Sequence, residues 1–230
     1  MQTRSADVLA DPVGESLRGP HAHLARSVGA AVTYVTDVAT FAAVPLDPSP
    51  ADWDDLARLL GPGGFADLFS LPVTPPPDWE PVFRLEGLQM VLDEVPSRTS
   101  SRVRELTADD APAMLTLAET TKPGPFWQRT PAMGRYVGIE DDGELVAMAG
   151  ERLHPPGWTE ISAVCTAPSA RGRGLAAALV RDVAATIVER GERPFLHVAA
   201  ANLAAVRLYE RLGFEVRREV VFHGYRVPRG

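Results

Sequence analysis

The stretch that decides the fold is Thr159–Ala176, which reads TEISAVCTAPSARGRGLA. Residues 159–167 are mostly apolar and predict a strand, and apolar residues recur at helical spacing from 175 to 188. Between them, the small residues of 171–174 let backbone N–H groups converge at a helix N-terminus. Free amides and the positive end of a helix dipole attract anions, so this unit predicts a phosphate site. A tight connection without a ligand is the alternative interpretation.

Two well-known phosphate loops do not fit these residues. A P-loop requires Lys followed by Ser or Thr after its last glycine, whereas Leu175 and Ala176 follow here. A dinucleotide-binding loop requires a third glycine and an acidic residue at the end of the next strand. That strand, residues 194–200, reads PFLHVAA and ends in alanines. The loop therefore belongs to neither class.

A second segment lies one helix and one strand further on. Asn202–Phe214 reads NLAAVRLYERLGF and is similar to the signature N-x-x-A-x-x-L-Y-x-x-L-G-F of the GNAT superfamily of N-acetyltransferases. The loop, Arg171-x-x-Gly174-x-Ala176, resembles that superfamily's Q/R-x-x-G-x-G/A pyrophosphate loop. The resemblance covers about residues 101–230, within the branch of glycine N-acyltransferase-like C-terminal domains. It implies an α/β GNAT fold, with a mixed, splayed central sheet flanked by helices.

The resemblance also implies a co-substrate, acetyl-CoA or another acyl-CoA, and no metal. In the family, the strand before the loop splays from its neighbour, and its free amides bind the pantetheine and polarise the thioester carbonyl. Asn202 is expected to cap the following helix whether or not it contacts pantetheine. The positions assigned to co-substrate binding in this sequence are Val164, Cys165, Thr166, Arg171, Gly172, Arg173, Gly174, Leu175, Ala176 and Asn202.

Two residues are the candidates for catalysis. Tyr209 stands where many family members place the general acid that protonates the departing thiolate, although a packed aromatic residue is the alternative. The attacking amine must lose a proton, so a base or a water chain is required. Glu160 is the first candidate base, followed by Glu151 and His154. Each of these three is equally compatible with a surface or hairpin position.

The remaining candidate residues concern the acceptor and a rival mechanism. Phe126, Trp127 and Glu151 are expected to contact the acceptor, although plain core or lid packing explains the two aromatic residues equally well. Cys165 and His197 suggest a Cys–His nucleophile. Both lie inside apolar strands, however, and the family transfers the acyl group directly. A buried structural thiol is therefore the favoured interpretation of Cys165.

Composition and charge narrow the classes of function. The net charge is −7 over 230 residues, with 6 basic and 14 acidic residues before position 101 and 17 basic and 16 acidic residues after it. Neither part is the basic surface that nucleic-acid binding requires. A single cysteine excludes a disulfide framework, and no apolar run is long enough to span a membrane. The N-terminus lacks the apolar segment of a secretory signal, so a cytoplasmic location is expected.

The chain is predicted to contain two units. Residues 1–100 form an N-terminal α/β subdomain of unknown role, and 101–230 form the GNAT domain, with a polar junction near 96–101. One interpretation of the first unit is a degenerate half of the same fold. Its predicted elements are a helix over 21–28, strands over 31–35 and 40–44, a helix over 52–60 and a strand over 82–92. In the second unit, strands are predicted over 103–106, 135–140, 145–152, 159–167, 194–199, 215–221 and 222–227, with helices from 109, 175 and 202.

These observations predict an N-acyltransferase. It would transfer an acetyl or other short acyl group from acyl-CoA to a primary amine by direct attack in a ternary complex. A small-molecule amine is the preferred acceptor, with a protein amine as the other option. The alternative is a non-catalytic acyl-CoA sensor or scaffold of the same fold. A nucleic-acid-associated regulator is disfavoured by the charge balance.

Overall fold

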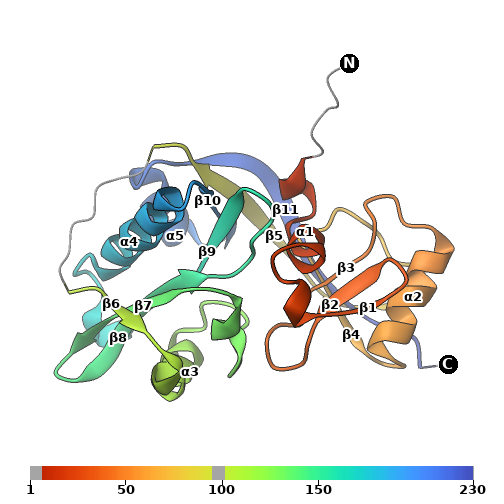
Figure 1. Cartoon of the computed structure of the whole chain (residues 1–230), viewed down its shortest axis with the longest axis horizontal. Helices are drawn as coiled ribbons and strands as arrows, with labels where there is room; N and C mark the ends of the chain where they lie inside the picture. Colours follow the sequence, from red (N-terminus) through yellow and green to blue (C-terminus); the bar gives the residue numbers. More distant parts are fainter. Residues whose placement is uncertain (1–6, 95–101, 230) are drawn as a thin grey trace.

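The computed structural model describes residues 7–94 and 102–229. Within these residues, eight strands form a mixed sheet in the order β4-β11-β5-β10-β9-β8-β7-β6, and three form a small antiparallel sheet in the order β1-β2-β3. Figure 1 shows the small sheet and its helices beside the large sheet, with β5 and β11 running between the two parts. The mixed sheet flanked by helices is the predicted GNAT architecture.

The element bounds are as follows. The large sheet contains β4 (Phe65–Phe69), β5 (Glu80–Leu92), β6 (Arg104–Leu106), β7 (Tyr136–Asp141), β8 (Glu144–Glu151), β9 (Trp158–Thr166), β10 (Arg193–Ala199) and β11 (Phe214–Arg226). The small sheet contains β1 (Ala25–Val28), β2 (Ala31–Tyr34) and β3 (Ala42–Ala43). The α-helices are α1 (Pro12–Arg18), α2 (Pro50–Leu60), α3 (Ala111–Thr121), α4 (Leu175–Glu189) and α5 (Leu203–Arg211).

Alternate residues of the central strands face two different cores. Val137 of β7 and Ala147 of β8 belong to the apolar cluster that packs against α4 and α5. Their neighbours Tyr136 and Met148 belong to the cluster that packs against α3. Successive side chains of a strand point to opposite faces, so α3 and the pair α4–α5 cover opposite faces of the sheet. Apolar burial on both faces explains why β7–β10 read as nearly continuous apolar runs.

The strands β9 and β10 separate part of the way along their length. They pair in parallel only from Trp158 to Glu160 of β9. Beyond that point β9 continues to pair with β8 as far as Thr166, whereas β10 continues to pair with β5 as far as Ala199. A bulge that includes Ala163, at a φ of +51°, shifts the register of β9 against β8. The edge of β9 that faces β10 is therefore unpaired after Glu160, which is the predicted splay.

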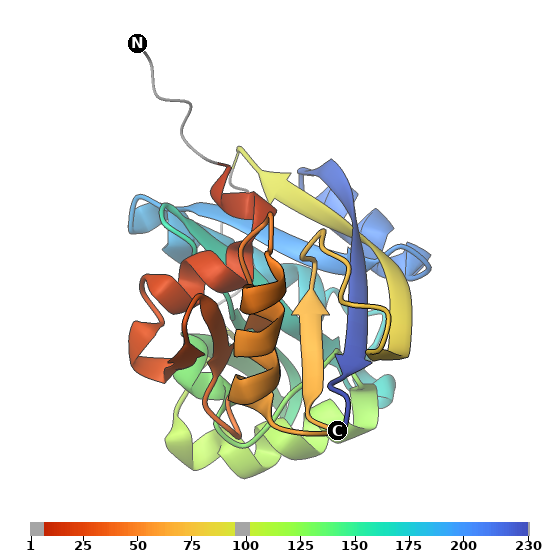
Figure 2. The ribbon, with the colours of Figure 1, turned by 90° about the vertical axis from the view of Figure 1, so that its right-hand side faces the viewer.

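The N-terminal residues contribute to both sheets. Strands β4 and β5 come from the first hundred residues, yet β5 is hydrogen-bonded between β10 and β11, and β4 pairs with β11. Figure 2 shows β4, β11 and β5 side by side. The predicted junction at 96–101 lies outside the described residues. The division at residue 100 and the interpretation of the first unit as a degenerate half of the fold stay predictions.

The structure tests several of the predicted helices and strands. The strand predicted over 82–92 is confirmed as β5. The helix predicted over 21–28 is wrong: a short 3-10 turn at Ala22–Leu24 leads into β1, which pairs with β2. The two strands predicted over 215–227 are one bulged strand, β11. Helix α1 and strand β4 were not predicted.

Candidate functional site

A cavity of about 750 Å³ opens where β9 and β10 separate, and we call it the splay cavity. One part of its wall is the edge of β9 with the loop and first turn of α4; another part comes from β4, β5 and β11. Its lining residues are Asp67, Phe69, Phe83, Leu85, Thr121–Pro125, Arg152, Ile161–Thr166, Ala170–Gly172, Gly174–Ala177, His197–Ala199, Asn202, Ala204, Ala205, Leu208, Tyr209, Arg211 and Phe222.

The loop before α4 has the backbone geometry of an anion site. Gly172 and Gly174 have φ values of +76° and +74°, and Gly174 is the N-cap of α4. These left-handed conformations turn the chain so that Leu175, Ala176 and Ala177 line the cavity. The N–H groups in the first turn of a helix have no intrahelical acceptor, and the helix dipole adds positive potential there. A phosphate group is the ligand that this geometry suits.

The two arginines of the loop behave differently. Arg171 lines the cavity, and its Nε donates a hydrogen bond to the carbonyl oxygen of Thr166 at 3.3 Å. Arg173 does not line the cavity; its guanidinium pairs with Asp141 of β7 at 2.7 Å. Arg173 is therefore the one residue of the predicted co-substrate set that the structure leaves outside the cavity.

The end of β9 forms one wall of the cavity. Val164, Cys165 and Thr166 all line it, and their contact with a co-substrate stays a prediction. The hydroxyl oxygen of Thr166 is buried and has no hydrogen-bond partner among the described residues, although most buried polar groups have one. Burial raises the pKa of the Cys165 thiol, which makes it a poor nucleophile.

Asn202 and Tyr209 both lie at the cavity on α5. The Asn202 side chain accepts a hydrogen bond from the backbone N–H of Ala205 at 3.2 Å, which confirms the predicted cap. Tyr209 lines the cavity and packs edge-on against Phe214, with ring centroids 5.9 Å apart. Burial raises the pKa of Tyr209 to about 12, so its hydroxyl stays protonated at neutral pH.

Glu160 occupies a different setting from the one predicted. It is fully buried and does not line the cavity, and its carboxylate forms a two-bonded ion pair with Arg152 at 2.6 and 2.7 Å. Burial alone would raise the pKa of Glu160, but the charge and hydrogen bonds of Arg152, with a further bond from His197, lower it. A fully paired carboxylate of lowered pKa is a weak proton acceptor. The geometry does not support the prediction that Glu160 is the base.

His197 is bound to the same carboxylate. Its Nδ1 lies 2.7 Å from Glu160 Oε1, and its Nε2 lies 3.1 Å from Gln89 Nε2. A neutral ring with its proton on Nδ1 satisfies both contacts, and burial lowers the pKa of His197 in agreement with that state. Both ring nitrogens are thus engaged away from Cys165. The arrangement does not form a Cys–His nucleophile.

The predicted acceptor residues do not lie at the cavity. Glu151 is buried in an ion pair with Arg190 at 2.7 Å. Phe126 packs edge-on against Tyr136 in the α3 core, and Trp127 packs against the N-terminal core. The neighbouring residues Thr121–Pro125 line the cavity instead. His154, the third candidate base, lies against His21, with ring centroids 4.9 Å apart.

Asp67 of β4 was not predicted, although it lines the cavity. Its carboxylate is 3% exposed; Oδ2 accepts a hydrogen bond from the Thr40 hydroxyl at 2.8 Å, while Oδ1 has no partner among the described residues. Burial raises the pKa of Asp67 to about 6. The signal in the sequence is an acidic residue inside the apolar run FADLF (65–69), which is uncommon unless the charge has a use.

The pKa of Asp67 predicts a pH-dependent stability. The folded state holds the Asp67 proton up to about pH 6, against an ordinary value of 3.8, so stability is lost as the pH rises through this window. Relative to an Asp67→Asn variant, the wild type should lose about 2 kcal/mol of unfolding free energy between pH 4.5 and pH 8. Urea unfolding of both proteins at the two pH values measures this difference. An equal pH dependence of the two proteins would contradict it.

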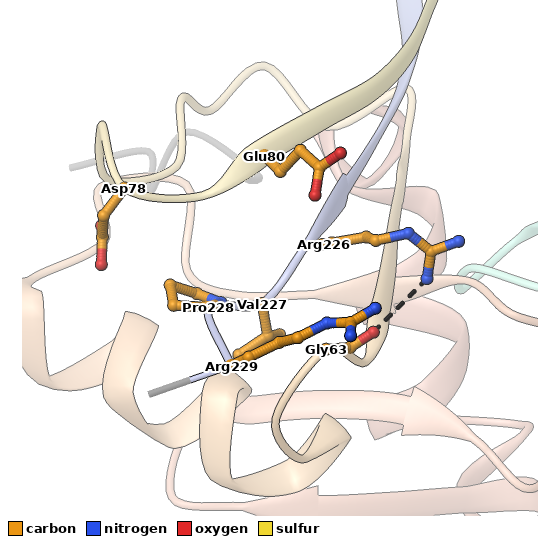
Figure 3. A pocket seen from close by; sticks show the side chains of 7 residues that line it. All are labelled: Gly63, Asp78, Glu80, Arg226, Val227, Pro228 and Arg229. Atoms are coloured by element: carbon orange, nitrogen blue, oxygen red, sulfur yellow. Dashed lines mark hydrogen bonds between the residues drawn. The ribbon is translucent and has the colours of Figure 1, made fainter.

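A second, shallower pocket of about 370 Å³ lies at the C-terminal end of the chain. Figure 3 shows Asp78 and Glu80 on one side of it and Arg226 and Arg229 on the other, with Arg226 Nη1 donating to the carbonyl oxygen of Gly63 at 3.4 Å. These four charged side chains are exposed. We assign this pocket no function. Among the described residues, no helix is long and apolar enough to cross a membrane, and no cluster of three His, Cys, Asp or Glu suits a metal.

Comparisons with known proteins agree with this architecture. Residues 136–223, which contain the loop, α4, α5 and most of β11, match the FR47-like protein family. The crystal structure of a GNAT-family protein from Novosphingobium aromaticivorans DSM 12444 is 40% identical, with a TM-score of 0.87 over 95% of this chain and 97% of that one. A GCN5-related N-acetyltransferase from Kribbella flavida shares the fold at 21% identity, with a TM-score of 0.64 over 96% of both chains. The chain belongs to the GNAT family.

Curated relatives match over shorter segments. The mycothiol acetyltransferase of Mycobacterium sp. (strain JLS) is 36% identical over 89 residues, which is 36% of this chain and 30% of that protein. The mycothiol acetyltransferase of Corynebacterium jeikeium (strain K411) is 42% identical over 78 residues, 33% of this chain and 21% of that protein. These matches span less than a third of either curated protein. The branch of glycine N-acyltransferase-like domains stays a prediction.

Proposed function

We propose that this protein is an acyl-CoA-dependent N-acyltransferase that transfers an acetyl or other short acyl group to a primary amine. The observation that carries the proposal is the splay cavity, which joins the unpaired edge of β9 to the N-terminus of α4. Such a cavity suits a ligand with two chemical features. One is an anionic group, which would lie at the N-terminus of α4, and the other is an extended, hydrogen-bonding arm, which would lie along β9. A coenzyme A thioester has both.

Each wall of the cavity has a role in this proposal. The N–H groups at Gly174–Ala177, with Arg171, bind the pyrophosphate. The backbone of Val164–Thr166 and the unpartnered Thr166 hydroxyl hydrogen-bond the pantetheine arm. An N–H fixed beside the thioester carbonyl stabilises the negative charge that develops on its oxygen during attack, an effect worth about 3–4 kcal/mol for one well-placed donor. Tyr209 donates its proton to the departing sulfur.

The second candidate function is an acyl-CoA sensor or scaffold without turnover. The ion-paired state of Glu160 favours it, because the first candidate base is not free. The protonated Tyr209 and the unpaired Asp67 carboxylate at the same cavity favour turnover. A small-molecule amine remains the proposed acceptor, since the cavity includes buried side chains deep in the sheet.

Calorimetric titration of acetyl-CoA tests the proposed binding site. We expect micromolar binding by the wild type and at least tenfold weaker binding by Gly174→Glu. At a φ of +74° a side chain costs about 1–2 kcal/mol of strain, and the new carboxylate repels phosphate at the helix N-terminus. Gly191→Glu is the matched control, because Gly191 has a φ of +81° and open space at the other end of the same helix.

The control should bind acetyl-CoA as the wild type does. Equal binding by Gly174→Glu would place the ligand elsewhere. Absence of binding by the folded wild type would remove the transferase proposal and leave a GNAT-shaped scaffold without this ligand.

A further inference from the structure

One end of the splay cavity is an aromatic surface built from β4, β11 and β5. Asp67 and Phe69 are two residues apart on β4, so their side chains share a face of the sheet. Phe222 of β11 is paired with Phe69, and the two rings are stacked with centroids 4.6 Å apart. Phe83 and Leu85 of β5 line the same cavity. Every one of these side chains comes from outside the loop, β9 and α5 that carry the co-substrate proposal.

A glycine opposite Asp67 lets two further rings approach. Gly224 of β11 pairs with Asp67, and a side-chain carbon at this glycine would lie 2.6 Å from the rings of both Phe65 and Phe83. The absent side chain allows those rings to meet across β11, with centroids 6.2 Å apart. The carboxylate of Asp67 is therefore bordered by aromatic rings along its own face of the sheet.

Among the described residues, no cation forms an ion pair with Asp67. The cation whose charge acts on Asp67 and lowers its pKa is Arg152, whose guanidinium lies over the Phe69 ring, with Cζ 4.5 Å from the centroid. However, Arg152 Nε and Nη2 both donate to Glu160. Asp67 retains one hydrogen bond, from Thr40, and one oxygen without a partner among the described residues. A buried ionised carboxylate in this state is costly, and an ammonium group placed beside it would offset that cost.

The exposed fraction of the side chains increases along the same surface, from Asp67 of β4 to the residues of β5. Asp67 is 3% exposed, whereas Phe83 and Leu85 are 39% and 44% exposed. A ligand that places a cation at Asp67 would therefore rest its remaining atoms on the apolar, accessible side chains of β5. Large exposed apolar residues that line a cavity are a frequent feature of small-molecule sites.

We propose that Asp67 binds the ammonium group of the acceptor and accepts a proton from its nitrogen during acyl transfer, and that the acceptor is a primary aralkylamine without a carboxylate. The inference rests on the proposed transferase function and names its acceptor class. The aromatic body of the amine lies against Phe83, Leu85 and the edge of the Phe69–Phe222 stack. A carboxylate next to the amine, as in an amino acid, would meet the like charge of Asp67.

The proton balance of the step is as follows. The bound ammonium first loses one proton to solvent, and the free amine nitrogen then attacks the thioester carbon. The C–N bond forms, the C–S bond breaks, and Asp67 accepts the second proton of the nitrogen as the amide forms. The sulfur leaves with a proton as a thiol, so one proton in all passes to solvent. A carboxylate can perform this proton transfer because the attacking nitrogen becomes strongly acidic once it is bonded to the carbonyl carbon.

Thiol release from acetyl-CoA measures the acceptor preference. We expect kcat/KM for 2-phenylethylamine to exceed the values for ethylamine and for phenylalanine by at least tenfold each. Phe83→Ala should raise KM for 2-phenylethylamine about tenfold and leave KM for ethylamine within twofold. Phe83 is partly exposed, so this variant is expected to fold.

Asp67→Asn tests the carboxylate itself. We expect kcat/KM for 2-phenylethylamine to fall about a hundredfold, and the acid limb of its pH profile, near pH 6 in the wild type, to disappear. The acetyl-CoA dissociation constant should stay within twofold. Asp11→Asn is the matched control: Asp11 is another buried carboxylate whose pKa burial raises to about 6, but it caps α1 outside the cavity. It should retain wild-type kcat/KM.

The outcomes separate this inference from the function on which it rests. If the wild type binds acetyl-CoA and releases thiol, but Asp67→Asn keeps its activity and its acid limb, the inference is overturned and the transferase proposal stands. Equal losses in Asp67→Asn and Asp11→Asn would also overturn it, because both would reflect folding. Phenylalanine or ethylamine as the better acceptor would overturn the acceptor class. If the wild type fails to bind acetyl-CoA, both proposals fall.

Discussion

Glu160→Gln is expected to lower the free energy of unfolding by about 3–5 kcal/mol, which corresponds to a melting temperature lower by roughly 10 °C. The substitution leaves the Arg152 guanidinium buried without its countercharge, on a side chain that is only 9% exposed. The bond from His197 Nδ1 is weakened as well. Removing one partner of a buried ion pair costs more than the pair itself contributes, because the remaining charge has lost its hydration.

Urea unfolding monitored by circular dichroism measures this loss. Glu86→Gln is the matched control, because Glu86 pairs with Arg84 and both side chains are 62% exposed. Exposed pairs are worth about 0–1 kcal/mol, so the control should differ little from the wild type. In Arg152→Met/Glu160→Gln, the loss should be smaller than in Glu160→Gln alone. A Glu160→Gln variant as stable as the wild type would show that the Arg152–Glu160 pair is not isolated from water.

The parts of the fold that the sequence predicts are those specified by local signals. Asp141-Asp142-Gly143 predicts the β7–β8 hairpin, where Asp142 and Gly143 indeed have positive φ values. Asn202 predicts the start of α5 through its own hydrogen bond. The loop glycines before α4 predict the turn that they form. In each case the residues that set the conformation lie within a few positions of one another.

The wrong and missing elements are those for which the hydrophobic pattern of the segment gives a weak or misleading signal. Residues 25–28 form β1 because they pair with β2, and this pairing overrides a local pattern compatible with a helix. Helix α1 has only 7 residues and contains a glycine, so periodicity gives little signal. It is held by the Asp11 cap and by burial of Val13 and Leu17. Strand β4 was hidden because Asp67 interrupts its apolar run.

The residues of the candidate site also fall into a part that local sequence predicts and a part that it does not. The cavity residues of the loop and α5 could be predicted because two sequence motifs contain them, and those of β9 because this strand directly precedes the first motif. The state of Glu160 could not, because it depends on which residue faces it across the β8–β9 connection, and this residue is Arg152. Asp67 reaches the cavity only because β4 pairs with β11, more than 140 positions further along the chain. No spacing within either segment encodes that contact.

Tyr209→Phe is expected to lower kcat for acyl transfer about a hundredfold, or about 2.7 kcal/mol of transition-state stabilisation. The departing sulfur is a thiolate until it gains a proton, and the Tyr209 hydroxyl at the cavity is the proposed donor. Phenylalanine keeps the ring that packs on Phe214, so the fold and the acetyl-CoA dissociation constant should change little. Steady-state thiol release and calorimetry measure the two quantities separately.

Tyr225→Phe is the matched control, because Tyr225 of β11 packs against His223 and does not line the splay cavity. It should retain wild-type kcat. The raised pKa of Tyr209, about 12, adds a second expectation: kcat should show no alkaline decline up to pH 10 from loss of its proton. A Tyr209→Phe variant with full kcat would restrict Tyr209 to packing. In that case the sulfur would leave as a thiolate without help from Tyr209.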